Sequence, residues 1–224
     1  MTVVLAADET GALARAAAAL DQGAVIGVPT DTVYGLVCLC SDAAAIDGLF
    51  AVKERPAEKA LPVLLGDVQQ ARAVVEGPLP PPARLLMERY WPGPLTLVLP
   101  AQPHLPTALT AGKGTVGVRL PAQPFLQALA RCVGPLASSS ANRSGAPPCA
   151  TASAVLEQLE GRIPLLVDAG PTPLAEPSTV LDLSAAQPEL LRPGPLGQEA
   201  LAAVCAVEEA GGCGTTRQRG RPRV

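Results

Sequence analysis

The sequence predicts a single α/β domain in which helices pack against a mixed β-sheet. Short strand-like apolar runs alternate with helix-like segments along the 224 residues. Strand-rich ends and proline-rich joints favour a mixed sheet over a regular parallel one. With 48% apolar residues, a chain of this length can bury one substantial core. We expect residues 1–197 to form the domain and residues 198–224 to form a short helix and an arginine-rich tail.

The first half of the chain alternates between helices and short strands. Thr10 is a candidate N-cap for a helix that ends near Leu20, before Gly23. The next apolar residues at helical spacing lie between Asp42 and Lys53. The expected elements are a helix over 10–20, strands over 25–29 and 61–65, helices over 42–53 and 67–75, a proline-rich bend over 78–82 and a helix ending at Tyr90.

The second half contains more strands. Trp91-Pro92-Gly93-Pro94 ends the preceding helix, because proline and glycine do not continue one. The expected elements are strands over 95–99, 115–120, 136–138, 165–168, 179–183 and 189–192, and helices over 123–132, 151–159 and 198–204.

Charge, cysteines and hydropathy exclude several classes of protein. The formal net charge is −3. Outside the arginine-rich residues 211–224, the chain has 13 basic and 20 acidic residues. The body of the protein is therefore not a basic surface for nucleic acid. The tail is either a solubilising end or an electrostatic contact for RNA. Six scattered cysteines and one histidine, His104, suit neither a secreted disulfide scaffold nor a metal site. No apolar run reaches the roughly 20 residues of a membrane span, and no leader is visible, so we expect a soluble, cytoplasmic protein without a membrane partner.

Two polar segments follow apolar runs and mark the expected ligand site. They are Pro-Thr-Asp-Thr-Val-Tyr-Gly-Leu at 29–36 and Ser-Ser-Ser-Ala-Asn-Arg-Ser-Gly at 138–145. Ligand sites in α/β proteins lie where buried strands give way to loops. The alternative for the second segment is a serine-rich loop capped by its own side chains.

Several cations are placed to neutralise an anion near these segments. Lys53, Arg55 and Lys59 cluster beside Pro56 at the end of a predicted helix, where stabilisation of the helix dipole is the alternative role. Thr115 and Arg119 lie four apart on one face of a predicted strand, and a cation on an inner face needs an anionic partner. With Ser178 and Arg192 at later strand ends, they predict one polar, positively charged pocket for a nucleotide and a small anionic co-substrate.

Other nucleotide and hydrolase signatures are absent from the sequence. It has no Walker loop and no Gly-x-Gly-x-x-Gly after the first strand, so a nucleotide would be held in another way. His104 has no nearby Ser or Cys nucleophile, so a hydrolase triad is not expected.

Seven separated motifs, in order, resemble the YrdC-like family of L-threonylcarbamoyl-AMP synthases. They are Pro-Thr-Asp-Thr-Val-Tyr-Gly-Leu at 29–36, Lys-x-Arg-Pro at 53–56, Trp-Pro-Gly-Pro-Leu-Thr at 91–96, Val-Gly-Val-Arg-Leu-Pro at 116–121, Ser-Ala-Asn-x-Ser-Gly at 140–145, Ser-Thr-Val at 178–180 and Leu-Arg-Pro-Gly at 191–194. The resemblance runs from about residue 8 to residue 197. It implies a twisted α/β sheet with a large concave basic cavity, in a short, single-domain member of the family.

The resemblance also implies the activity and the site residues. The family makes threonylcarbamoyl-AMP and pyrophosphate from L-threonine, bicarbonate and ATP. The resemblance implies that Mg²⁺ is bound through the ATP phosphates and not by the protein. It also implies that the product is used to modify tRNA, together with other tRNA-modification proteins. The implied residues at the centre of the cavity are Lys53, Arg55, Ser140 and Asn142; those for ATP are Lys53, Arg55, Lys59, Thr115, Asn142, Thr151 and Arg192; those for L-threonine are Thr30, Thr32, Arg119, Ser140 and Ser178, with Arg119 meeting the carboxylate.

Two other functions remain open at this point. The same fold and the arginine-rich tail would suit a non-catalytic module that binds double-stranded RNA or tRNA, although the acidic body argues against it. The third possibility is a carbamoyl-adenylate enzyme that uses a different amine.

Overall fold

The computed structural model describes residues 1–54, 59–205 and, for the backbone only, 208–209. In this part of the chain the strands form one mixed sheet in the order β1-β8-β2-β3-β7-β4-β6-β5-β9-β10-β11. The strands are β1 (Val3–Ala6), β2 (Ile26–Val28), β3 (Gly35–Leu39), β4 (Val63–Leu64), β5 (Leu95–Pro100), β6 (Thr115–Arg119), β7 (Leu136–Ser140), β8 (Leu165–Asp168), β9 (Thr179–Asp182), β10 (Glu189–Arg192) and β11 (Glu208–Glu209). The sheet contains both parallel pairs, such as β4 with β6, and antiparallel pairs, such as β3 with β7, which confirms the mixed sheet.

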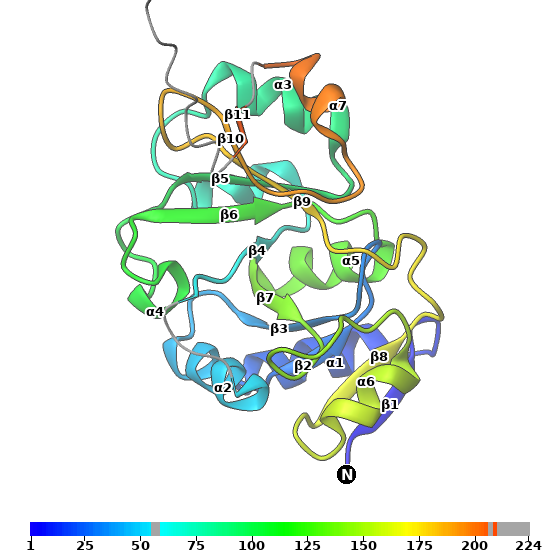
Figure 1. Cartoon of the computed structure of the whole chain (residues 1–224). Coiled ribbons are helices and arrows are strands. Elements are labelled where there is room, and N and C mark those ends of the chain that lie inside the picture. The colour runs from blue at the N-terminus through cyan, green and yellow to red at the C-terminus, as the bar shows by residue number, and fades with distance from the viewer. Residues whose placement is uncertain (55–58, 206–207, 210–224) are drawn as a thin grey trace, which may run out of the picture.

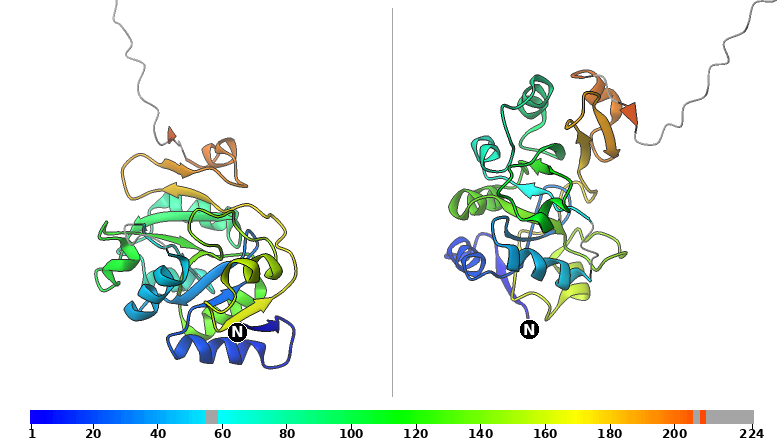
Figure 2. Two further views of the ribbon diagram at one scale, coloured as in Figure 1. Left: turned by 60° about the horizontal axis from the view of Figure 1, so that its bottom comes forward. Right: turned by 90° about the vertical axis from the view of Figure 1, so that its left-hand side faces the viewer.

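Helices cover both faces of this sheet. They are α1 (Ala12–Asp21), α2 (Ala43–Lys53), α3 (Pro81–Tyr90), α4 (Thr107–Thr110), α5 (Pro124–Val133), α6 (Ala152–Leu159) and α7 (Gln198–Ala202), with a 3₁₀ turn at Val68–Ala73. Helices α1 and α5 lie on one side of the sheet and α2 on the other (Figure 2, right). The strands β9 and β10 extend the sheet beyond β5, at the end of the molecule far from the N-terminus (Figure 1).

Alternate side chains of the central strands enter two hydrophobic clusters. On β3, Leu36 and Cys38 join the larger cluster with α2, whereas Val37 joins the smaller cluster with α1 and α5. This alternation is the period of two that a strand imposes on its side chains. The central strands are therefore buried on both faces, which fixes their register and the positions of the polar residues at their ends.

The expected start of one helix and the expected type of another are wrong, for identifiable reasons. Gly11, at φ +86°, is the N-cap of α1 and makes no side-chain cap, so Thr10 does not cap this helix. The helix expected over 67–75 is only the 3₁₀ turn, with the Asp67 side chain accepting from the Gln70 N–H. Gln70 in turn binds the Gly66 N–H and the Ala130 carbonyl, so contact with α5 shapes this segment.

The sequence predicted the positions of some other elements to within a residue or two and missed several elements entirely. Helices α2 and α6 begin one residue after their expected starts, because Asp42 and Thr151 are side-chain caps. Elements absent from the prediction are β1, β3, α4 and β11, and β7 extends to Ser140 instead of ending at residue 138. Helix α7 ends at Ala202, and the tail expected after it lies largely outside the described residues. None of the described helices has the length and apolarity needed to cross a membrane.

The described cysteines are free thiols in contrasting environments. Burial raises the pKa of Cys38 to about 12 and that of Cys40 to about 11, whereas Cys132 is exposed at the end of α5. Because the thiolate is the reactive form, we expect iodoacetamide at pH 8 to modify Cys132 in the native protein and to spare Cys38 and Cys40. Peptide mass spectrometry would show this, with all thiols reacting in guanidinium chloride as the control. Native labelling of Cys38 as fast as that of Cys132 would contradict the burial argument.

Candidate functional site

A cavity of about 300 Å³ opens in the sheet, where residues of seven strands (β3, β4, β5, β6, β7, β9 and β10) and of the segments 30–34, 60–62 and 177–178 form its walls. One part of its wall is apolar, and the other carries hydroxyl groups and two guanidinium groups. The polar lining residues are Thr30, Thr32, Tyr34, Thr96, Arg119, Ser138, Ser139, Ser140, Ser178 and Arg192; the others are Val33, Gly35, Ala60, Leu61, Pro62, Leu64, Val98, Gly117, Pro177 and Val180. Six of the residues expected at the site therefore meet in one cavity: Thr30, Thr32, Arg119, Ser140, Ser178 and Arg192.

The serines lie on a strand and not on a loop, which corrects the sequence interpretation. Ser138 to Ser140 continue β7, paired antiparallel with β3 so that Ser140 lies opposite Gly35. The Ser138 N–H also donates to the Pro62 carbonyl, which ties β7 to the start of β4. A strand holds these serines more rigidly than a loop would, because each backbone is fixed by its neighbours.

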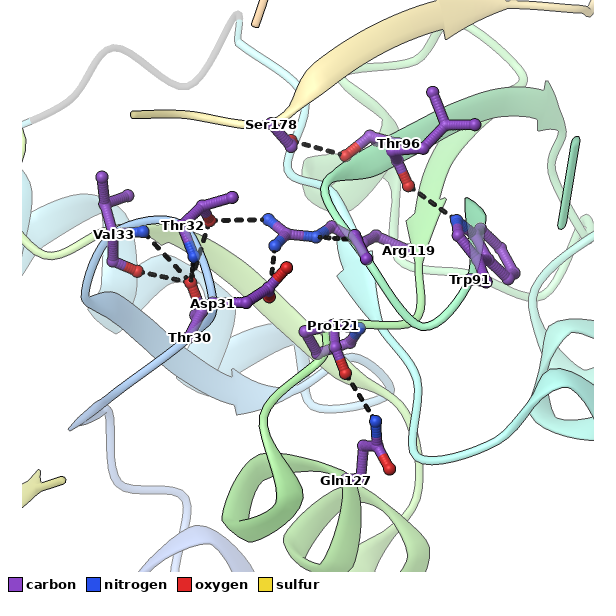
Figure 3. Close-up of polar contacts among 12 residues, drawn as sticks. Thr30, Asp31, Thr32, Val33, Trp91, Thr96, Arg119, Pro121, Gln127 and Ser178 are labelled. Carbon is purple, nitrogen blue, oxygen red and sulfur yellow. Dashed lines mark hydrogen bonds and ion pairs between the residues drawn. The ribbon is translucent and has the colours of Figure 1, made fainter. Parts of the chain in front are cut away.

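Thr30 and Thr32 lie in a tight turn between β2 and β3. The Thr30 hydroxyl oxygen accepts the N–H groups of Thr32 and Val33 at 3.0 and 3.2 Å, and it donates to the Val33 carbonyl at 2.7 Å (Figure 3). The Thr32 hydroxyl lies 2.9 Å from that of Thr30. Side-chain bonds of this kind replace backbone pairing in a turn, so both threonines are held against the cavity wall.

Arg119, the last residue of β6, is buried and held by three acceptors. Its guanidinium donates to Asp31 Oδ1 at 2.5 Å, to Thr32 Oγ1 at 2.9 Å and to the Gly93 carbonyl at 3.0 Å (Figure 3). Burial lowers the pKa of Arg119, and the ion pair with Asp31 opposes that effect. The guanidinium is thus fixed in position and paired before any ligand arrives.

Sequence reasoning missed Asp31, although a signal for it was present. A buried cation requires an anionic partner, and the sequence analysis named only a substrate carboxylate as the partner of Arg119. Asp31 stands between Thr30 and Thr32, within the first polar segment, and is only 4% exposed. It lies next to two residues that line the cavity but does not itself line it.

A second group of contacts surrounds Ser178, just before β9. The Ser178 hydroxyl lies 2.8 Å from the Thr96 hydroxyl on β5 (Figure 3). Arg192 at the end of β10 donates through Nε and Nη2 to the Ser178 carbonyl at 2.9 and 2.7 Å, and through Nη2 to its hydroxyl at 3.0 Å. Thr96 is a further residue that sequence reasoning quoted in a motif without assigning it to the site.

Lys53 and Asn142 lie next to Ser140, but neither lines the cavity at whose centre both were expected. Lys53 Nζ donates to the Asn142 carbonyl at 2.7 Å, to Asn142 Oδ1 at 3.3 Å and to the Ser140 carbonyl. The Asn142 amide donates to the carbonyls of Arg143 and Ala146 at 2.8 and 2.7 Å. Both side chains are buried and fix the loop that follows β7.

The remaining candidates lie outside this cavity or outside the described residues. Thr115 begins β6 opposite Pro100, at the other end of the strand from Arg119. Thr151 caps α6 by accepting the Ala154 N–H at 3.2 Å. Lys59 is exposed and does not line the cavity. Arg55 lies outside the described residues.

Comparison with known proteins gives consistent matches. The Sua5/YciO/YrdC family model, described as telomere recombination, matches residues 18–194. A threonylcarbamoyl-AMP synthase of Bacillus subtilis (strain 168) is 42% identical over 194 residues, which are 86% of this chain and 56% of that protein. A relative in Mycobacterium tuberculosis (strain ATCC 25618 / H37Rv) is 38% identical over 198 residues, which are 88% of this chain and 91% of its own length.

A solved structure also resembles this chain in fold over most of its length. Sua5 of Pyrococcus abyssi, in a crystal structure with L-threonine, superposes with a TM-score of 0.88 at 35% identity over 92% of this chain and 63% of that one. This chain therefore spans a little over half the length of the Bacillus relative and under two thirds of the Pyrococcus protein.

Proposed function

Because the chain belongs to the Sua5/YciO/YrdC family, we propose that it is an L-threonylcarbamoyladenylate synthase. It would form threonylcarbamoyl-AMP and pyrophosphate from L-threonine, bicarbonate and ATP, for the threonylcarbamoyladenosine modification of tRNA. The observation that carries this proposal is the meeting of Arg119, Arg192 and a row of hydroxyl groups in a single cavity. The relatives named threonylcarbamoyl-AMP synthase and the Sua5 structure with L-threonine support it.

The proposed reaction needs no protein nucleophile. The amine of L-threonine takes up bicarbonate and loses water to give a carbamate, and a carbamate oxygen attacks the α-phosphorus of ATP. The bond from that phosphorus to the bridging oxygen breaks, and pyrophosphate leaves. Positioning and charge neutralisation are then the main tasks of the protein.

The cavity offers groups for each substrate. We assign Thr30, Thr32, Ser140 and Ser178 to the binding of L-threonine. Arg119 would bind the carboxylate of L-threonine through guanidinium N–H groups that do not donate to Asp31. We assign Arg192 to the ATP phosphates, with Arg55, Lys59, Thr115 and Thr151 as further ATP-binding candidates. Lys53 would contribute by holding the Ser140 carbonyl, and Asn142 by holding the loop that follows it.

Mg²⁺ would be bound mainly by the substrate. Within the described residues no three His, Cys, Asp or Glu side chains gather as a metal site. Triphosphate oxygens and waters are the usual ligands of Mg²⁺ at such sites, so the ion would neutralise the charge that develops on pyrophosphate. Binding to RNA without catalysis is not favoured, because the named relatives are enzymes.

One incubation tests the proposal. The purified protein with ATP, Mg²⁺, bicarbonate and labelled L-threonine is expected to release pyrophosphate and to form a labile labelled adenylate. Omitting any one substrate should stop both products, and a panel of amino acids would reveal a different amine substrate. Salt-sensitive tRNA binding without any ATP consumption would refute the proposal in favour of an RNA-binding module.

A further inference from the structure

The two arginines of the cavity have different electrostatic partners. Arg119 forms an ion pair with Asp31, and both side chains are at least nine-tenths buried. Arg192 donates to the carbonyl and hydroxyl of Ser178 and forms no ion pair with an acid in the described part of the chain. The Arg119–Asp31 pair is therefore close to neutral, whereas Arg192 contributes a net positive charge to the cavity.

We propose that Asp31 is a specificity-determining residue that reserves Arg119 for the carboxylate of the amino acid and directs the triphosphate to Arg192. The inference rests on the proposed function and deepens it, because it names what sorts the two anionic substrates within one cavity. Asp31 acts through Arg119 and not by touching a substrate, so it is a positioning residue.

The geometry leaves Arg119 able to bind one more anion of modest charge. A guanidinium has five N–H donors, and the described contacts of Arg119 use one at Nε, one at Nη1 and one at Nη2. Two N–H groups therefore remain, which is the number that a carboxylate accepts from a guanidinium. Asp31 contributes only Oδ1 to the pair, so it neutralises the charge without covering the whole guanidinium.

Asp31 lies behind the cavity wall. It lines a separate, smaller cavity of about 140 Å³, shared with Thr30 and Thr172. Its Oδ2 is buried and has no hydrogen-bond partner within the described protein. Its negative charge therefore stays close to Arg119 and is poorly screened, which makes it effective on any anion that approaches from the main cavity.

The charge of Asp31 discriminates between the two substrates. Repulsion grows with the product of the charges, so a triphosphate or pyrophosphate is repelled several times more strongly than a single carboxylate. The carboxylate of an amino acid also belongs to a zwitterion and gains two directed hydrogen bonds from Arg119. A repulsive element against the wrong ligand is a general source of specificity.

The first test is Asp31→Asn, which keeps the shape and removes the charge. Pyrophosphate and L-threonine are titrated by calorimetry, each in the absence and presence of the other. In the wild-type protein we expect the two ligands to bind together. In Asp31→Asn we expect pyrophosphate to bind about tenfold tighter and to compete with L-threonine, because Arg119 has become an unpaired cation.

The matched control is Asp47→Asn, which removes an equal charge from the exposed face of α2. It should leave both affinities unchanged, so that an effect of net charge alone is excluded. Equal pyrophosphate affinity and absence of competition in Asp31→Asn would overturn the proposal.

A second variant keeps the proposal testable if Asp31→Asn does not fold. In Arg192→Met, with Asp31 intact, pyrophosphate affinity should fall at least about tenfold while L-threonine still binds. Undiminished pyrophosphate binding that competes with L-threonine would show that Arg119 accepts polyanions despite Asp31, and would overturn the proposal. These titrations measure binding and do not require the protein to turn over. If the wild-type protein binds L-threonine but forms no adenylate, the proposed function is contradicted, whereas the role proposed for Asp31 is still tested by the titrations.

Discussion

Arg119→Met is expected to lower the free energy of unfolding by about 3–5 kcal/mol and to abolish pyrophosphate release that depends on L-threonine. The substitution leaves Asp31 buried without its cation, and a buried charge that loses its partner is costly. It also removes donors to Thr32 and to the Gly93 carbonyl, which loosens the turn between β2 and β3. Urea denaturation and a pyrophosphate-release assay would measure the two effects.

Two controls separate stability from catalysis. Arg15→Met breaks the exposed pair with Glu9 and should change stability by no more than about 1 kcal/mol. The double variant Asp31→Asn, Arg119→Met removes both buried charges, so it should recover much of the lost stability and none of the activity. Recovery of L-threonine-dependent turnover in the double variant would show that Arg119 does not bind the substrate.

Lys53→Met is expected to reduce the rate of pyrophosphate release about 100- to 1,000-fold and to destabilise the protein by about 1–3 kcal/mol. Lys53 Nζ donates to two backbone carbonyls, at Ser140 and Asn142, and both acceptors are left without this donor in the variant. The loop after β7 would then shift, and the Ser140 hydroxyl with it. Because these contacts are buried, the variant is expected to lose stability as well as activity.

Lys113→Met provides the matched control for this lysine. Lys113 is exposed in the turn before β6, so its replacement should alter neither stability nor rate. Hydrogen exchange should localise the effect of Lys53→Met to residues 140–146, whose backbone it restrains. Wild-type turnover in Lys53→Met would contradict the role assigned to this loop.

Local patterns predicted most of the elements but not their pairing. Asp42 and Thr151, where two helices were expected to begin, are the side-chain caps of α2 and α6 and act within three residues. The segment after Thr30 looked like a loop because polar residues interrupt it, yet Gly35 begins a strand paired with β2 and β7. Pairing between strands a hundred residues apart depends on the order of the whole sheet, which local propensity does not encode.

The sequence by itself determined which kinds of group are available to a site: hydroxyls after two apolar runs, cations at strand and helix ends, and seven motifs in the order of one family. Only the tertiary structure decided how those groups act on one another. It placed Asp31 beside Arg119, 88 residues away along the chain, and Lys53 beneath Ser140. The physical reason is that a buried charge is costly unless it has a partner of opposite charge or hydrogen-bond acceptors nearby. The packing of the sheet determines which groups are near enough to be that partner.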